Sequence, residues 1–113
     1  MNPILRSVSA LMLVTATGAF FGSAMAADTP SAARGKKLFN DPALGGSTNS
    51  MSCNGCHPSG KGLEYAWKNP KLAETINICI TGQLKGKALP LDSMEMRSLV
   101  LYVRSLKSPV SGY

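Results

Sequence analysis

The stretch Cys53-Asn54-Gly55-Cys56-His57 has the pattern C-x-x-C-H, which is the attachment signal for a c-type haem. In such a site each thiol adds to a vinyl group on one edge of the porphyrin, and the histidine supplies one axial ligand to the iron. Glycine between the two cysteines allows a tight backbone turn at little steric cost. The motif therefore predicts one covalent haem c, with Cys53 and Cys56 as thioether donors and His57 as an axial iron ligand.

Two other kinds of site can be built on closely spaced cysteines. A thioredoxin-like redox pair needs a βαβ domain around it, and the sequence has no such strand pattern. A structural zinc site could use Cys53, Cys56, the remote Cys79 and one further ligand. His57 is the only histidine, however, and its place directly after Cys56 suits a tetrahedral site poorly. Haem attachment is the favoured interpretation.

Residues 1–26 have the features of a secretory signal peptide. Arg6 gives a short positive region, residues 8–21 are mostly apolar, and Ala24-Met25-Ala26 matches a small-residue cleavage site. The alternative is an uncleaved membrane anchor, because residues 8–27 are nearly long enough to span a bilayer. Threonine, glycine and serine residues weaken the apolar stretch. We therefore expect cleavage, export to the periplasm and no membrane segment in the mature protein.

Cleavage would leave residues 27–113 as one domain of 87 residues. So short a chain buries little surface by itself, and an enclosed haem would supply much of the missing core. Of the 12 basic residues only Arg6 would be removed, and all six acidic residues would stay, which leaves a net charge near +5. This charge suits docking on an acidic protein partner. Nucleic acid is a poor candidate, because the basic residues are scattered and the protein is exported.

The mature sequence predicts an all-α domain. Thr29-Pro30 has the N-cap and N1 residue types that begin a helix, which would run to about Asn40. Asn69-Pro70 repeats this pattern before a second helix, which would end at Thr81 with Gly82 after it. Between these helices three residues are expected along the haem wall: Leu63, Tyr65 and Trp67.

The last helix would begin after Asp92 or Ser93 as its N-cap. Its apolar residues recur at helical spacing and predict a buried stripe: Met96, Leu99, Val100, Val103 and Leu106. In the first helix Gly35 and Phe39 share one face, and the glycine permits close approach of another helix. The order of elements resembles the small cytochrome c fold, and the resemblance implies that these two residues meet the last helix at Leu99 and Tyr102.

This order of elements fits the small cytochrome c fold, in which the first and last helices cross around one covalent haem. In ordinary small cytochromes c a methionine in the loop before the last helix is the second axial ligand. Here the loop from Thr81 to Leu91 contains no methionine. Met96 lies on the buried stripe, so it either binds the iron or packs in the core. Met94 lies off the stripe and is a weaker candidate for an iron ligand. Cys79 lies on the apolar stripe of its own helix and is predicted to face the interior.

Four segments follow an order that resembles the haem domains of periplasmic thiosulfate dehydrogenases and the related SoxA-type sulfur-oxidation cytochromes: Ile76-Asn77-Ile78-Cys79, Leu84–Pro90, Asp92–Met96 and Leu101–Val103. The resemblance covers residues 31–107, with a shorter segment after His57 than in that family. In that family a cysteine after an Ile-Asn-x segment is an axial thiolate. The resemblance therefore implies Cys79 as the second iron ligand, ahead of Met96 and then Met94.

The sequence as a whole predicts an exported monohaem electron carrier and not an enzyme, because it has one haem motif where those dehydrogenases commonly have two. One alternative is a haem subunit of a thiosulfate-oxidising system, which Cys79 favours. Another is a haem-based binder of small ligands, which the missing loop methionine favours. Four lysines could steer a redox protein partner with an acidic surface towards the haem edge: Lys61, Lys68, Lys85 and Lys87.

Overall fold

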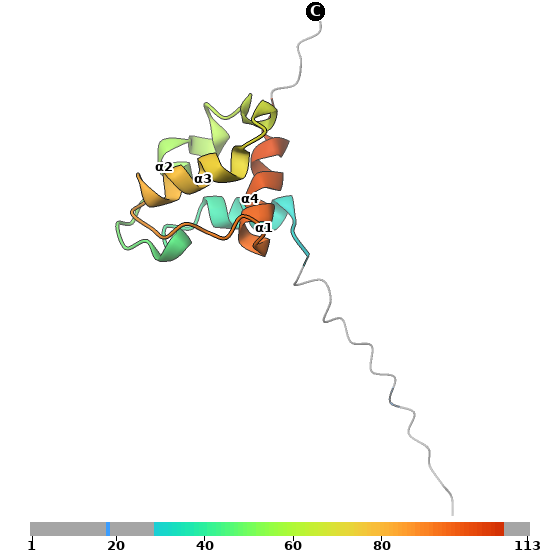
Figure 1. Ribbon diagram of the computed structural model, residues 1–113, viewed down its shortest axis with the longest axis horizontal. Helices are drawn as coiled ribbons and strands as arrows, with labels where there is room; N and C mark the ends of the chain where they lie inside the picture. Colours follow the sequence, from blue (N-terminus) through green and yellow to red (C-terminus); the bar gives the residue numbers. More distant parts are fainter. Residues whose placement is uncertain (1–17, 19–28, 108–113) are drawn as a thin grey trace, which may run out of the picture.

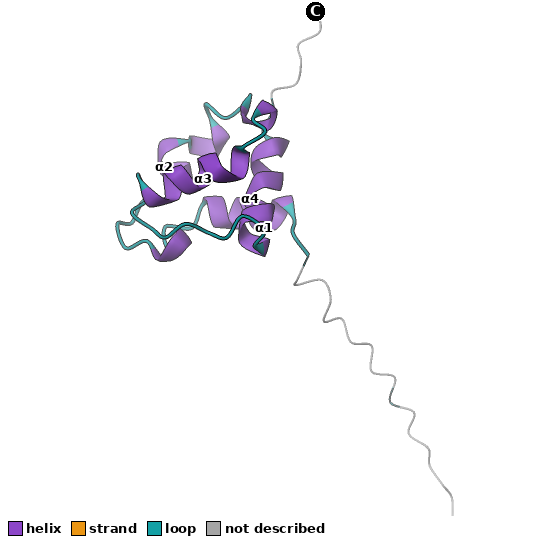
Figure 2. Ribbon diagram, in the orientation of Figure 1, coloured by secondary structure: helices purple, strands orange, loops and turns teal. Residues whose placement is uncertain are grey.

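The computed structural model describes residue 18 and residues 29–107, so the predicted signal peptide lies outside the described residues except at position 18. Within these residues all regular structure is helical, which confirms the predicted all-α class (Figures 1 and 2). The α-helices are α1 Ala32–Phe39, α2 Cys53–Cys56, α3 Leu72–Thr81 and α4 Met94–Ser105. Short 3-10 turns lie between α1 and α3: η2 Leu44–Gly46, η3 Pro58–Gly60 and η4 Ala66–Lys68.

Helix α1 begins two residues later than the sequence predicted. Its N-cap is Ser31 and not Thr29, because the Oγ of Ser31 accepts a hydrogen bond from the backbone N–H of Arg34 at 3.1 Å. The backbone N–H of Ser31 also donates to the Oγ of Ser98 on α4, at 3.2 Å. This contact with a distant helix selects Ser31 as the cap. The end of the helix at Phe39 lies within one residue of the predicted end.

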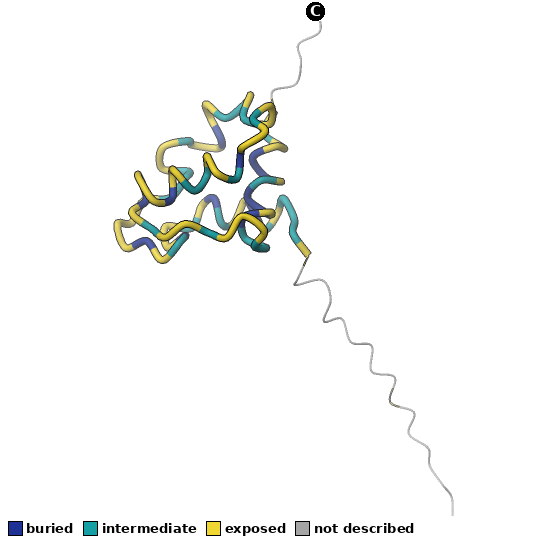
Figure 3. Tube along the Cα trace, viewed as in Figure 1, coloured by how far each residue is buried: buried dark blue, intermediate teal, exposed yellow. Residues whose placement is uncertain are grey.

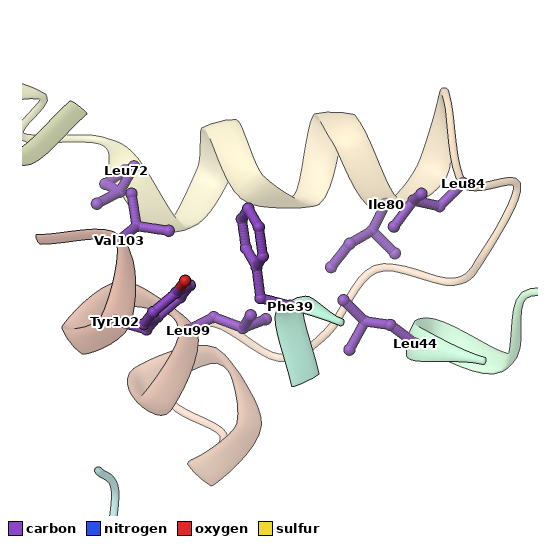
Figure 4. Close-up of a cluster of buried hydrophobic side chains, with 8 residues drawn as sticks. All are labelled: Phe39, Leu44, Leu72, Ile80, Leu84, Leu99, Tyr102 and Val103. Carbon is purple, nitrogen blue, oxygen red and sulfur yellow. The ribbon is translucent and has the colours of Figure 1, made fainter. Parts of the chain in front are cut away.

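Helices α1 and α4 cross where both carry small residues. A Cβ atom on Gly35 would lie 2.0 Å from the carbonyl oxygen of Ser98, so only glycine lets the two backbones come this close. The ring of Phe39 packs edge-on against that of Tyr102, with centroids 5.1 Å apart and planes at 65°. Leu99 belongs to the same buried cluster (Figure 4). The predicted meeting of these two helices is therefore confirmed.

Helix α3 begins at Leu72, two residues later than predicted. Asn69 does not cap the helix in the expected way, because its side chain bridges two other groups. Its Oδ1 accepts from the backbone N–H of Lys71 at 2.8 Å, and its Nδ2 donates to the Oγ1 of Thr75 at 2.9 Å. The chain thus makes a turn at positions 70–71 before the helix starts. The end at Thr81 is as predicted.

The segment 83–90 joins α3 to α4 without regular structure, and backbone hydrogen bonds tie it to its neighbours. The N–H of Lys87 donates to the carbonyl oxygen of Gly45 at 2.7 Å. Asn77 binds the backbone of Leu89 twice, since its Nδ2 donates to the carbonyl oxygen and its Oδ1 accepts from the N–H, both at 2.8 Å. The segment is therefore held against α3 and η2.

Helix α4 begins after Ser93, whose Oγ accepts a hydrogen bond from the backbone N–H of Met96 at 3.2 Å. Of the two predicted caps Ser93 is therefore correct and Asp92 is not. The predicted stripe is buried at Met96, Leu99 and Val103 and half-buried at Val100 and Leu106. Figure 3 shows the chain coloured by burial, and buried positions alternate with more exposed ones along α4.

The core consists of buried apolar side chains that point towards one another from α1, η2, α3, α4 and the segment 83–90 (Figure 4). Its members are Phe39, Leu44, Leu72, Ile80, Leu84, Leu99, Tyr102 and Val103. Partly buried apolar residues pack around this cluster, and one of them is Cys53 of the C-x-x-C-H motif. None of the helices in the described part of the chain has the length and apolar character needed to cross a membrane.

Candidate functional site

A cavity of about 140 Å³ lies beside the core, and all four α-helices contribute to its wall. Most of the wall is apolar and comes from Phe39, Leu63, Ala66, Leu72, Ile76, Leu84, Leu99 and Val103. Several of these residues also belong to the core cluster. The apolar stripes predicted on the helices therefore serve two purposes, because they pack the helices together and also line the cavity.

Cys53 and Cys56 line this cavity from the single turn of α2. The backbone N–H of His57 donates to the carbonyl oxygen of Cys53 at 2.9 Å and closes the turn. Residues three apart on a helix share a face, so both thiols are presented to the same side. Gly55 does not have the left-handed backbone that only glycine adopts readily. Its missing side chain instead makes room for Met51, whose sulfur would lie 2.8 Å from an added Cβ.

The imidazole of His57 lines the same cavity, and one of its nitrogens already has a partner. Nδ1 lies 3.0 Å from the carbonyl oxygen of Lys61. Since a carbonyl oxygen can only accept a hydrogen bond, this contact places the proton on Nδ1 and leaves the lone pair of Nε2 for a metal ion. Gly62 follows with φ +91°, so a glycine completes the turn that brings this carbonyl to the imidazole.

Cys79 lines the cavity from α3, but it is exposed to solvent and is not enclosed in the interior as the sequence predicted. Its helical neighbours Leu72 and Ile76 line the cavity with it, as the predicted stripe requires, while Ile80 is fully buried. Burial raises the pKa of the Cys53 thiol to about 11, and the charge of a Cys79 thiolate opposes ionisation further. Cys53 is therefore a neutral thiol at pH 7. Cys53 of α2 and Cys79 of α3 line the same cavity.

The two methionines considered as second iron ligands do not line the cavity. Met96 is fully buried and Met94 is half-buried, both in the first turn of α4. The structure therefore brings His57 and Cys79 to one cavity and leaves both methionines outside it.

The expected haem wall at Leu63, Tyr65 and Trp67 is only partly correct. Leu63 lines the cavity, but Tyr65 is 70% exposed, Trp67 is 41% exposed and neither ring lines it. Leu63, Tyr65 and Trp67 are alternate residues, which would share a face only in an extended chain. The chain instead forms helical turns here, in which residues three apart share a face. Leu63 and Ala66 consequently face the cavity and the two rings face outward.

Polar residues of the cavity wall were not identified from the sequence: Ser52, Asn69, Thr75 and Gln83. Thr75 could have been found, because it lies four residues before Cys79 and so on the same face of the helix. Phe39, Leu99 and Val103 were expected only as helix-packing residues. The sequence contains no signal that would place Ser52 or Gln83 beside the cavity, since both lie in loops.

The donor set is compatible with a covalently attached haem. A haem brings four nitrogen ligands of its own and needs only one or two axial side chains, which His57 and Cys79 could supply. A structural zinc site needs about four protein ligands. In the described part of the chain, no group of three or more histidine, cysteine or acidic side chains is placed to hold a metal ion. Comparisons with protein-family models, curated proteins and solved structures find no match to this chain.

Proposed function

We propose that the protein binds one haem covalently through Cys53 and Cys56, with His57 as an axial iron ligand, and carries single electrons. The observation that supports this most is that these three side chains line one apolar cavity while Nε2 of His57 stays available to a metal ion. The crossing of α1 and α4 beside the cavity suits the small cytochrome c fold. We propose this fold for residues 27–113, and a periplasmic location after export.

The side chains around the cavity have separate tasks in this proposal. When bound, the haem supplies an iron that accepts and releases one electron. Cys53 and Cys56 each add their S–H across a vinyl double bond, and the resulting thioethers carry no charge into the apolar cavity. The Lys61 carbonyl holds the imidazole of His57 in one tautomer and one orientation. The apolar wall would give the haem surroundings with few polar groups.

For the second axial position we propose Cys79, ahead of Met96 and then Met94. Cys79 lines the cavity and both methionines lie outside it. A bound thiol is deprotonated, because the metal cation favours the thiolate. A thiolate stabilises ferric iron and lowers the reduction potential, whereas methionine raises it. The cavity therefore best supports an electron carrier with a low reduction potential.

A second candidate function is that of a haem subunit in the oxidation of sulfur compounds such as thiosulfate. Cys79 at the cavity supports it, because the resemblance to thiosulfate dehydrogenases implies an axial thiolate at this position. A haem-based binder of small ligands needs an open or displaceable second position. The presence of Cys79 on the cavity wall argues against that third candidate.

The proposal is tested by exporting the full chain in a bacterium that attaches haem c and measuring its intact mass. We expect residues 27–113 plus one haem that resists extraction by acidified acetone. Cys53→Ser and Cys56→Ser should each remove one thioether bond, whereas Cys79→Ser, the control, should keep both. Extractable haem, or bound zinc in its place, would contradict the proposal. Turnover of thiosulfate would favour the second candidate, and carbon monoxide binding by the reduced protein would favour the third.

A further inference from the structure

An exposed surface with two aromatic rings and two lysines lies on and beside turn η4. Tyr65 and Trp67 are both exposed large side chains. The Nζ of Lys68 lies 5.5 Å from the ring centroid of each, and the Nζ of Lys107 lies 5.9 Å from the centroid of Trp67. We call these four residues the aromatic–lysine surface. Two cations therefore gather around one exposed indole.

The lysines of this surface have no acidic partner within the described residues. The ion pair found there joins Arg34 to Glu95 at 4.0 Å. Glu64, the acidic residue next to Tyr65, instead accepts a hydrogen bond from the backbone N–H of Gly62 at 3.0 Å. Ammonium groups and an indole N–H can only donate hydrogen bonds. The complementary partner is therefore one that presents acceptors with negative charge, which in a protein are carboxylates.

This surface lies against the outer side of the cavity wall. Ala66, which lines the cavity, stands between Tyr65 and Trp67 in the same turn. On α4, Val103 also lines the cavity and lies four residues before Lys107. Figure 1 shows η4 beside the C-terminal end of α4, and these two elements are in contact. A molecule docked here would be separated from the cavity by little more than one layer of side chains.

We propose that the aromatic–lysine surface docks an acidic protein, which would be the redox partner of the electron carrier proposed above. This inference rests on the proposed function, because a redox partner must bind close to the haem. Tyrosine and tryptophan are enriched among the residues that dominate binding energy in protein interfaces, and the lysines add charge complementarity. Of the four lysines that the sequence suggested for docking, Lys68 belongs to this surface. Lys85 and Lys87 lie on the segment 83–90 and have no aromatic partner in the described residues.

The probe for this proposal is a hexaglutamate peptide titrated into the reduced, haem-loaded protein. The readout is the indole N–H resonance of Trp67, which is the only tryptophan in the chain. An ionic strength of about 0.1 M screens charges that are more than about 10 Å apart, so distant lysines contribute little. Lys68→Gln and Lys107→Gln are the test variants. Lys36→Gln and Lys37→Gln, at exposed positions of α1, remove the same charge elsewhere and are the matched controls.

We expect a saturable shift of the indole resonance, and about a twofold to fivefold rise in Kd for each test variant. The control variants should bind as the unchanged protein does. Equal weakening in all four variants would mean a general charge effect and would overturn the proposal, as would an indole resonance that does not move. Binding to phosphatidylglycerol vesicles but not to the peptide would assign the surface to anionic lipid instead. Intact mass reports haem attachment separately, so a failure of docking is distinguishable from a failure of the proposed function.

Discussion

The crossing of α1 and α4 gives the sharpest prediction for stability. In Gly35→Ala the new methyl group would lie 2.0 Å from the carbonyl oxygen of Ser98 and 2.7 Å from the Cβ of Tyr102. Ordinary contacts between carbon and a carbonyl oxygen are about 3.3–3.6 Å, so the new contact is too short by about 1.3–1.6 Å and the two helices must move apart. The obstructing oxygen belongs to the backbone of α4 and cannot turn aside as a side chain could.

Two effects oppose each other in this variant. Alanine is favoured over glycine within a helix by about 1 kcal/mol. Overpacking typically costs about 1–3 kcal/mol and occasionally more, and this clash is with backbone. A gap of about 0.5–1 Å also forfeits a quarter to a half of the dispersion energy of each separated contact, which here includes the pair Phe39 and Tyr102. We therefore expect a net loss of at least about 2 kcal/mol of unfolding free energy.

Urea unfolding of the haem-loaded protein, followed by circular dichroism, measures this loss. For a chain of this size a loss of about 2 kcal/mol corresponds to a fall in Tm of about 8–16 °C. Lys37→Ala, on the exposed side of the same helix, is the control and should change stability by less than about 0.5 kcal/mol. A Gly35→Ala protein as stable as the unchanged protein would show that the helices do not approach as closely as described.

Three further predictions concern α4 and the haem ligands. Ser93→Ala removes the N-cap bond to α4 and should cost about 1 kcal/mol in urea unfolding, more than Ser105→Ala near the end of that helix. His57→Ala should abolish stable folding, because in the proposed function iron ligation would hold the core together; native helix content by circular dichroism would contradict this. Cys79→Met should raise the reduction potential of the haem. Met96→Leu should leave the absorption spectrum of the ferric protein unchanged. A spectrum that changes in the Met96 variant and not in the Cys79 variant would make Met96 the ligand.

The sequence predicts those parts of the fold that depend on local pattern. The stripe at Leu99 and Val103 follows from helical spacing, and it is buried. The contact of Phe39 with Tyr102 was expected from the fold that the order of helices resembles, and it is also present. The start of α1 does not follow from local pattern, because Thr29 and Ser31 are both good N-caps. The contact of Ser31 with Ser98 decides between them, and it depends on how the helices pack.

For the candidate site, too, the sequence predicts the features that depend on local pattern and misses those that depend on how the chain packs. The C-x-x-C-H motif and the stripe that carries Cys79 locate the thiols and the imidazole without any structure. The hydrogen bond from His57 to the Lys61 carbonyl depends on the turn that Gly62 completes, and no residue type signals it. The outward position of Trp67 was missed because a short turn of 3-10 helix has too few residues to show a period.

Cys79 and Met96 differ in how much the structure must change before each side chain could bind an iron in the cavity. Met96 is fully buried, and drawing its side chain into the cavity would forfeit about 1.5–3 kcal/mol of burial and leave a void behind it. Its backbone N–H also donates to Ser93, so the first turn of α4 would be disturbed. Cys79 already lines the cavity and needs only to lose a proton, which a metal cation favours. If Met96 were the ligand, the backbone amides at the start of α4 would exchange hydrogen faster than they would with Met96 buried. If Cys79 were the ligand, their exchange rates would not rise.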